Sequence, residues 1–252
     1  MIEVRNLYKS FGEVEVLQDI NARFAKGKVS QIIGKSGSGK SVLAKCVIGL
    51  YAPTSGEVLY DGKSFQSMEK EEVRQLRQEI GMLFQSSALF DSLTVLENVM
   101  FPLRMFATMN EREMRERADF CLKRVKIEGA DAKYPAEISG GMQKRVGIAR
   151  AIAMNPKYLF VDEPNSGLDP QTSIVIDNLI SDLTAEYDMT TLVITHDMNS
   201  VMEAGDNILF IHQGRGWWHG TRDQLLESDN KELNDFIFAS GLMREVKRSL
   251  KG

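Results

Sequence analysis

A glycine-rich segment near the N-terminus has the residue types and spacing that bind the phosphates of a nucleoside triphosphate. It reads Gly34-Lys35-Ser36-Gly37-Ser38-Gly39-Lys40-Ser41. Its glycines let backbone N–H groups turn towards anionic oxygens. We expect the Lys40 ammonium to reach the β- and γ-phosphates and the Ser41 hydroxyl to reach Mg²⁺. The alternative is a surface turn rich in Gly and Ser, but residues 29–33 and 42–44 are apolar and read as the flanking strand and helix.

A second segment supplies two neighbouring carboxylates. Residues 158–161 are apolar, and Asp162 and Glu163 follow them. A buried parallel strand would place both acids at its carboxyl end, where open α/β sheets bind their ligands. We expect Asp162 to support the metal and Glu163 to polarise the attacking water as a general base. The alternative is a strand that merely runs into an acidic turn.

A third segment, Ile138 to Arg145, contains a Ser-Gly-Gly turn made of Ser139, Gly140 and Gly141. The free N–H groups of such a turn suit an anion, and the turn is expected to open a helix over Val146–Met154. One short chain therefore contains two phosphate-directed turns.

Together with Gln85 and the segments 166–169 and 195–197, this order of motifs resembles the ATP-binding-cassette (ABC) ATPases over nearly the whole chain. The resemblance implies ATP and Mg²⁺ as cofactors. It also implies a head-to-tail homodimer in which each subunit's Ser-Gly-Gly turn closes over the ATP of the other.

Further site residues follow from the same resemblance. Gln85 would ligate Mg²⁺ or the lytic water through its side-chain carbonyl, and His196 would contact the γ-phosphate. Asp169 would face the neighbouring subunit. Phe11 would stack on the adenine ring, with Tyr8 as the substitute, because stacking needs only an aromatic face.

Met142 stands where this family usually has glutamine. The run Ser139 to Met142, together with 83–95 and 97–99, resembles the Mla/MCE-type lipid-transport ATPases of double-membraned bacteria. The alternative is that Met142 simply packs under the start of its helix. The resemblance implies an ATPase subunit that powers phospholipid movement through a separate integral-membrane permease of Mla/MCE type, without direct contact to nucleic acid. Other readings are a cell-division or lipoprotein-release ATPase and a non-transport ATP-gated clamp.

The expected fold is α/β, a P-loop NTPase with a RecA-like parallel-sheet core, an antiparallel β layer up to about Phe24 and an inserted α-helical lobe. We expect one ABC ATPase domain over 1–252, with the catalytic core in 1–85 and 155–229, the helical lobe in 86–154 and a C-terminal helical extension in 230–252. The lobe is expected either to receive a permease helix or to form its own core with the apolar residues Met100, Phe101, Met105, Phe106 and Met109.

Composition restricts the remaining function classes. The chain has 252 residues, with 31 basic against 35 acidic side chains and a net charge of -4, so it presents no basic field suited to nucleic acid. Cys46 and Cys121 have no disulfide or zinc spacing, which favours a reduced compartment. The N-terminus lacks the pattern of a secretion signal, and no apolar stretch approaches the roughly 20 residues that span a bilayer. We therefore expect a cytoplasmic protein held peripherally at the inner membrane by its permease.

Overall fold

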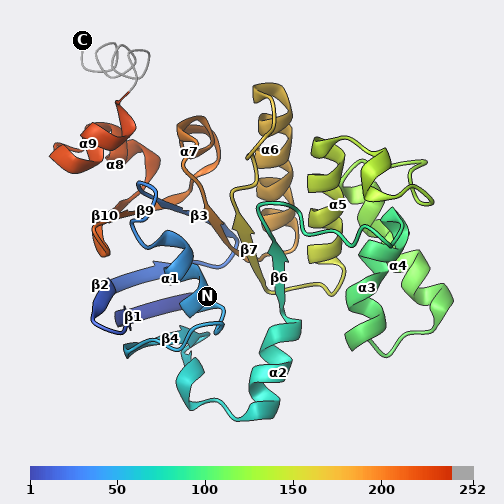
Figure 1. The fold of residues 1–252 in the computed structure, drawn as a ribbon, viewed down its shortest axis with the longest axis horizontal. Coiled ribbons are helices and arrows are strands. Elements are labelled where there is room, and N and C mark those ends of the chain that lie inside the picture. The colour runs from blue at the N-terminus through green and yellow to red at the C-terminus, as the bar shows by residue number, and fades with distance from the viewer. Residues whose placement is uncertain (240–252) are drawn as a thin grey trace. The chain divides into compact units, whose positions relative to one another are not determined.

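The computed structural model of the protein describes residues 1–239, which form two compact units (Figure 1). Unit 1 comprises Met1–Ala25, Val29–Ser67 and the described residues from Ile194 onwards, and unit 2 comprises Lys26–Lys28 and Met68–Val193. Residues 240–252 lie outside the described part, and with them the end of the expected C-terminal extension. The expected division into a core and a lobe at 86–154 stays a prediction.

An antiparallel sheet forms the first part of unit 1, as the sequence predicts. Its strand order is β2-β1-β4-β5, with β1 (Ile2–Phe11), β2 (Val14–Phe24), β4 (Ser55–Tyr60) and β5 (Lys63–Ser64). Gly12 turns between β1 and β2 with a φ of 59°. Asp61 and Gly62 also have positive φ values, 49° and 85°, which is the backbone that an Asp-Gly hairpin turn requires. In β1 the apolar residues Ile2, Val4 and Leu7 are buried, whereas Arg5 and Asn6 are exposed.

The strand before the phosphate loop, β3 (Lys28–Ile33), runs parallel to β9 (Asn207–His212), and β10 (Arg215–Gly220) pairs antiparallel to β9. The turn between β9 and β10 is formed by Gln213 and Gly214, both with positive φ. Arg215 and Gly216 already belong to β10. The other elements of unit 1 are η1 (Phe65–Ser67), α1 (Lys40–Val47), α7 (Met198–Ala204), α8 (Arg222–Glu227) and α9 (Lys231–Ile237).

Unit 2 contains three neighbouring strands in the order β8-β7-β6. They are β8 (Thr190–Ile194), β7 (Tyr158–Asp162) and β6 (Ile80–Leu83), of which β6 and β7 are parallel. All five residues of β8 are buried, as are the first four of β7. Two further helices complete this part, α2 (Lys70–Gln78) and α6 (Pro170–Glu186), where Pro170 occupies the first turn as predicted.

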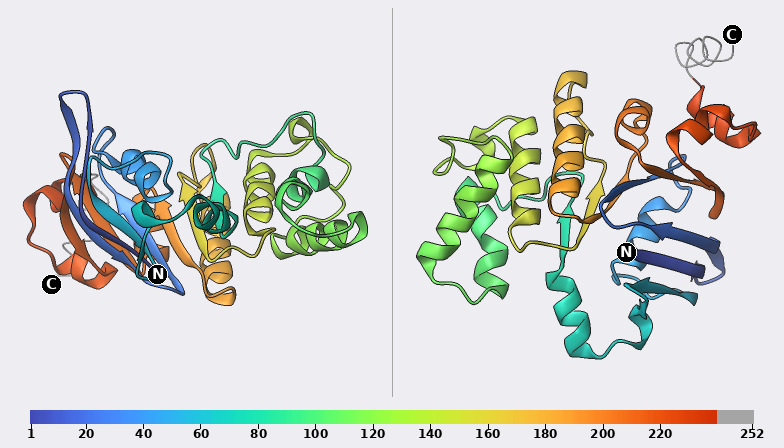
Figure 2. Two further views of the ribbon diagram at one scale, coloured as in Figure 1. Left: turned by 90° about the horizontal axis from the view of Figure 1, so that it is seen from below. Right: turned by 180° about the vertical axis from the view of Figure 1, so that it is seen from behind.

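Three helices of unit 2, α3 (Val95–Phe106), α4 (Glu111–Arg124) and α5 (Gly140–Ile152), pack side by side in the views of Figures 1 and 2, with the short η2 (Pro135–Glu137) between α4 and α5. Thr94 caps α3 with Glu97, and Asn110 caps α4 with Glu113, so both helices begin with a capping box. Helix α5 begins at Gly140, six residues before the expected start, because the Ser139 hydroxyl accepts the N–H of Met142 and caps the helix there.

The apolar residues of the lobe divide between core and surface. Met100 is fully buried, whereas Met105, Phe106 and Met109 are exposed. Met100 therefore belongs to the core of the lobe, and the expectation that the lobe receives a permease helix stays a prediction. Cys46 and Cys121 are buried free thiols. Within residues 1–239, no helix is both long and apolar enough to cross a lipid bilayer.

Candidate nucleotide site

The phosphate loop of unit 1 has a backbone that only glycine adopts easily. Gly34, Gly37 and Gly39 have φ values of 150°, 77° and 108°. A Cβ at Gly34 would lie 2.3 Å from the carbonyl oxygen of Ile211, and one at Gly39 would lie 2.7 Å from Cδ2 of Leu17. The loop therefore folds tightly against its neighbours and keeps its N–H groups close together.

Lys40 is buried and folds back over the loop that precedes it. Its Nζ donates to the carbonyl oxygens of Gly34, at 2.8 Å, and of Lys35, at 3.1 Å. Helix α1 begins at Lys40, and its first turn has neither a side-chain cap nor an acidic residue. No acidic side chain of that first turn therefore neutralises the positive end of the helix dipole.

These features fit a bound phosphate. The hydroxyl of Ser38 is buried and has no hydrogen-bond partner within the described chain, so an anion in the loop would satisfy it. Ser36, Gly37 and Ser41 are exposed and open to a ligand. A helix N-terminus, a lysine and a hydroxyl are the groups that hold the phosphates of a nucleotide and its magnesium.

His196 follows β8 in unit 1, where its neighbours Thr195 and Asp197 are held by hydrogen bonds. The N–H of Thr195 donates to the carbonyl oxygen of Ile32 at 3.2 Å, which ties this segment to the end of β3 next to the phosphate loop. Asp197 donates its N–H to the Thr195 hydroxyl and caps α7. The side chain of His196 is exposed.

The predicted adenine platform lies on β1. Phe11 is 45 % exposed, and its ring meets the ring of Tyr51 edge-on with centroids 5.3 Å apart. Lys9 Nζ lies 4.8 Å from the Phe11 centroid. Tyr8, the substitute, is half-buried, so Phe11 is the more accessible of the two.

In unit 2, hydrogen bonds connect the backbone of Glu163, which follows the end of β7, with Gln85. Glu163 has a φ of 47°, a left-handed conformation that is uncommon outside glycine. Lys144 Nζ donates to the carbonyl oxygen of Glu163 at 3.2 Å and also to that of Gln85. Gln85 Nε2 in turn donates to the Ser166 hydroxyl at 3.3 Å.

The Ser-Gly-Gly residues form the first turn of α5, which has no acidic residue. A Cβ at Gly141 would lie 2.7 Å from Cγ2 of Thr172, so the glycine allows α5 to approach the start of α6. Asp169 caps α6 and accepts the N–H of Thr172 at 3.0 Å and its hydroxyl at 2.6 Å. These hydrogen bonds lower the pKa of Asp169, which keeps the carboxylate ionised.

Within residues 1–239, no group of three or more His, Cys, Asp or Glu side chains could hold a metal ion. Magnesium commonly takes one or two protein carboxylates and completes its shell with phosphates and water. Ser41, Gln85 and Asp162 each have an oxygen atom that can ligate magnesium, and their assignment as ligands stays a prediction.

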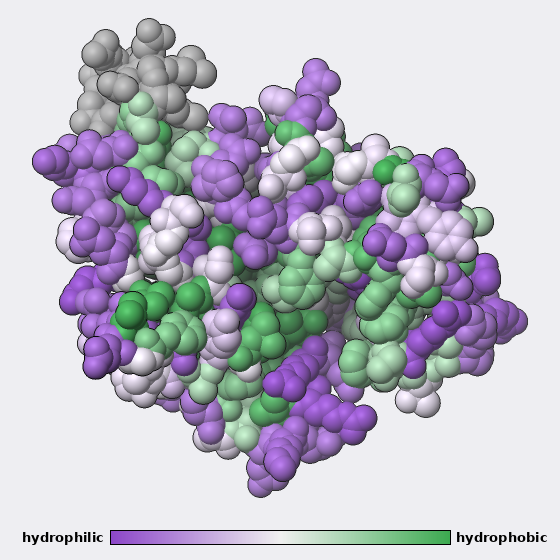
Figure 3. Space-filling view, in the orientation of Figure 1, coloured by the Kyte–Doolittle hydropathy of each residue, from purple (hydrophilic) through white to green (hydrophobic). Residues whose placement is uncertain are grey.

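Unit 2 also contains a groove of about 500 Å³. Its walls come from α2, β6, α3, α5 and the segment after Gln85, and they include Arg77, Phe84, Phe90, Phe101, Phe106 and Arg150. The rings of Phe90 and Phe101 lie 4.5 Å apart, and the side chains of Phe84, Phe90 and Phe106 are exposed. In Figure 3 the surface over α3 is coloured as apolar.

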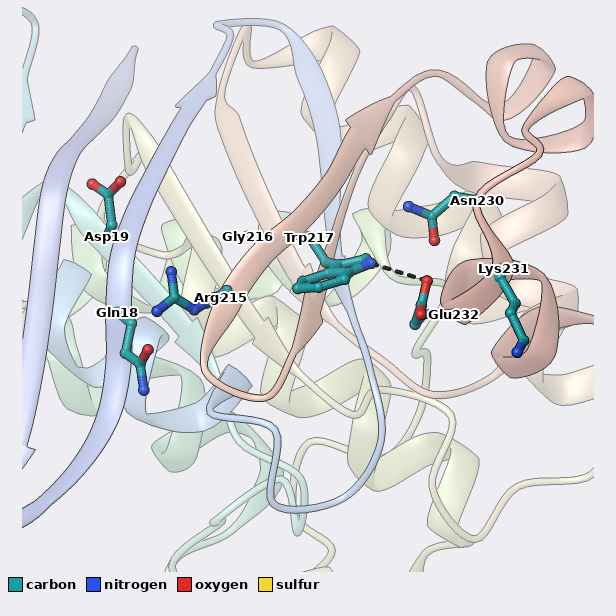
Figure 4. A pocket seen from close by; sticks show the side chains of 8 residues that line it. All are labelled: Gln18, Asp19, Arg215, Gly216, Trp217, Asn230, Lys231 and Glu232. Atoms are coloured by element: carbon teal, nitrogen blue, oxygen red, sulfur yellow. Dashed lines mark hydrogen bonds between the residues drawn. The ribbon is translucent and has the colours of Figure 1, made fainter.

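A second hollow, of about 510 Å³, lies in unit 1 (Figure 4). The indole N–H of Trp217 on β10 donates there to Glu232 of α9 at 3.3 Å. This hollow contains none of the predicted nucleotide residues; its lining is Gln18, Asp19, Arg215, Gly216, Trp217, Asn230, Lys231 and Glu232.

The profile of the ABC transporter family matches residues 17–166. The chain belongs to this family. It is 39 % identical to the probable ribonucleotide transport ATP-binding protein mkl of Mycobacterium leprae, over 94 % of this chain and 68 % of that protein. It is 38 % identical to the methionine import ATP-binding protein MetN of Desulfitobacterium hafniense, over 99 % of this chain and 76 % of that protein. It is 36 % identical to the intermembrane phospholipid transport system ATP-binding protein MlaF of Haemophilus influenzae, over 94 % of this chain and 90 % of that protein.

Solved structures agree with this membership. The dimeric post-hydrolysis state of the ATP-binding cassette MJ0796, bound to ADP and Pi, is 34 % identical and superimposes with a TM-score of 0.79, covering 88 % of this chain and 99 % of that one. The cbiO1 structure from Clostridium perfringens is 30 % identical and superimposes with a TM-score of 0.84, covering 100 % of this chain and 98 % of that one. The predicted ABC ATPase fold is thereby confirmed, as are ATP hydrolysis and the use of ATP with Mg²⁺.

Sequence reasoning missed three residues that hold the segment after β6 in place. Lys144 holds Gln85, as described above. Arg150 donates to the carbonyl oxygens of Ser87 and Ala88, both at 2.7 Å. Asn98 is fully buried and bonds to the backbone of residues 90–94. In the sequence, the signal for these three residues was a basic or amide side chain on a helix face that is otherwise apolar.

Proposed function

We propose that this ABC ATPase powers phospholipid transport between the membranes of a bacterial envelope through a separate permease of Mla/MCE type. The observation that carries the proposal is Met142 in the first turn of α5, directly after Ser139, Gly140 and Gly141. The similarity to MlaF of Haemophilus influenzae, which extends over most of both chains, supports it. We also propose a location on the cytoplasmic face of the inner membrane.

In the proposed reaction, this chain positions the γ-phosphoryl group and the attacking water. Lys40 neutralises charge on the phosphates. Ser41, Gln85 and Asp162 would hold a magnesium ion, which would supply further charge neutralisation. Glu163 orients the water and accepts its proton, and His196 contacts the γ-phosphate. Phosphoryl transfer needs mainly such positioning and charge stabilisation.

We infer that the active form is a head-to-tail homodimer. The first turn of α5 offers free N–H groups and no acidic side chain, so it suits the γ-phosphate of an ATP held by the partner's phosphate loop. Asp169 would lie at the same dimer interface. The dimeric MJ0796 cassette, a relative at 34 % identity, is consistent with this arrangement.

The groove of unit 2 is the proposed docking site for the permease. Exposed aromatic rings in a concave surface suit the apolar face of a short helix. Arg77 is exposed at the rim and has no ion-pair partner among residues 1–239, so an acidic residue on that helix would complement it.

Reconstitution tests the transport assignment. The ATPase is purified from membranes with its bound subunits, placed in vesicles, and followed by transfer of labelled phospholipid. We expect a permease and an MCE-type subunit to co-purify and lipid transfer to require ATP. A complex that takes up methionine with ATP and moves no lipid would replace the lipid assignment with methionine import, the function that the name of the MetN relatives gives.

A matched pair of substitutions tests the docking site. Phe106→Asp places a charge in the groove, whereas Phe120→Asp places one on α4 outside it; the two rings are 52 % and 44 % exposed. We expect Phe106→Asp to weaken capture of the permease by about tenfold or more, because an unpaired charge in an apolar contact is costly. Phe120→Asp should leave capture unchanged. Equal effects of both substitutions would remove the groove as the docking site.

A further inference from the structure

Lys144 is a buried lysine that the proposed reaction does not use. It lies in the second turn of α5, and its side chain is only 4 % exposed. A lysine is rarely buried so completely unless its ammonium group is paired or hydrogen-bonded. Burial lowers the pKa of Lys144, and the nearby charges of Asp162 and Glu163 act in the opposite direction.

The ammonium group of Lys144 takes part in a closed ring of hydrogen bonds with three loop residues. It donates to the carbonyl oxygens of Gln85 and, at 3.2 Å, of Glu163. Gln85 Nε2 donates to the Ser166 hydroxyl at 3.3 Å, and the N–H of Ser166 donates to the carbonyl oxygen of Glu163 at 3.3 Å. The ring therefore joins the segment after β6, the end of β7 and the turn before α6 to one side chain of α5.

We propose that Lys144 is a positioning residue for ATP hydrolysis. Its hydrogen bonds hold the backbone of Glu163 and of Gln85 in position relative to helix α5. The inference rests on the proposed function, in which Glu163 orients the attacking water. Glu163 has a φ of 47°, and a residue keeps such a backbone only where its surroundings hold it. The bond from Lys144 to the Glu163 carbonyl supplies part of that restraint.

The position of Lys144 also links two parts of the proposed mechanism. Ser139 begins α5, and Lys144 lies five residues further along the same helix. A displacement of α5 when Ser139 meets the ATP of a partner subunit would therefore be passed to Gln85 and Glu163 together. Small misplacements of a catalytic group reduce rates strongly, by about a hundredfold per ångström in some enzymes.

The test replaces Lys144 with methionine, which keeps the length of the side chain and removes its charge and hydrogen bonds. In the purified full chain we expect kcat for ATP hydrolysis to fall by about tenfold to a hundredfold, with the Kd for a fluorescent ATP analogue unchanged within about threefold. Lys144→Arg should recover most of the lost kcat. The control is Arg117→Met, because Arg117 also donates to two backbone carbonyls, those of Ile152 and Ala153, but touches none of the ring residues.

Two further variants keep the inference falsifiable if Lys144→Met folds poorly. Ser166→Ala opens the ring at a half-buried hydroxyl and should lower kcat by several fold. In a Glu163→Gln background, adding Lys144→Met should cause no further loss, because both changes act on one group.

Normal kcat in Lys144→Met, beside a slow Glu163→Gln enzyme, would overturn the role of Lys144 alone. If Arg117→Met lowers kcat by as much as Lys144→Met does, that result would also overturn the role of Lys144. Normal kcat in Glu163→Gln would instead overturn the catalytic assignment of Glu163, and the inference about Lys144 with it.

Discussion

Replacing Asn98 with alanine should destabilise the helical part of unit 2 strongly. Asn98 is fully buried in α3, and its side chain makes four hydrogen bonds to the backbone of the preceding segment. Oδ1 accepts the N–H of Phe90 at 2.8 Å. Nδ2 donates to the carbonyl oxygens of Phe90, Leu93 and Thr94 at 3.1, 3.1 and 3.0 Å.

The size of the effect follows from which of these backbone groups keep a partner. The carbonyl of Phe90 still accepts the N–H of Leu93, and that of Thr94 still accepts the backbone N–H of Asn98. The N–H of Phe90 and the carbonyl of Leu93 have no second partner among residues 1–239. Two unsatisfied backbone groups at about 1–2 kcal/mol each give a loss of about 2–4 kcal/mol in the free energy of unfolding.

Urea unfolding followed by circular dichroism measures this loss. The matched control is Asn110→Ala, which removes an exposed helix cap from α4 in the same lobe and should cost about 1 kcal/mol. Asn98→Asp should cost at least as much as Asn98→Ala, because its carboxylate would face three carbonyl oxygens. A loss from Asn98→Ala no larger than that from Asn110→Ala would refute the reasoning.

Three further predictions concern the chemistry of the chain. Glu163→Gln should keep ATP binding and slow hydrolysis by about 100-fold or more, as the loss of a positioned base does; steady-state turnover within a few fold of the unmodified chain would exclude that role. Mixing Lys40→Ala with Ser139→Arg subunits should recover one intact composite site per mixed dimer, whereas complete inactivity of demonstrated mixed dimers would indicate sites formed within single subunits. Burial raises the pKa of Cys46 and of Cys121 to about 11, so iodoacetamide at pH 8 should label neither thiol until urea unfolds the chain. Because both pKa values are raised above the ordinary 9.0, the stability gained by keeping the thiols protonated is present below pH 9 and should be lost as the pH rises towards 11.

Local sequence is enough to predict the features that depend on a few adjacent residues. The phosphate loop was predictable because its three glycines adopt positive φ values beside a lysine and a helix start. The caps at Thr94 and Asn110 and the Asp61-Gly62 turn were predictable for the same reason, since each bond is made within four residues.

The tertiary structure decided features whose partners lie far apart in the chain. The two glycines after Ser139 disfavour a helix, so the sequence placed the start of α5 too late; the Ser139 cap and the close approach of Gly141 to Thr172 account for the earlier start. Periodicity likewise left open which lobe methionines are core, and packing buries Met100 but leaves Met105 exposed.

At the candidate site, the contacts of Lys144 also depend on partners that lie far apart in the chain. Its partners Gln85 and Glu163 are 59 and 19 residues away, and its role becomes visible only when α5 packs beside β6. Local sequence therefore predicts which groups bind and cleave ATP, because their chemistry depends on residue type and short spacing. Packing between distant segments determined which groups hold them in place.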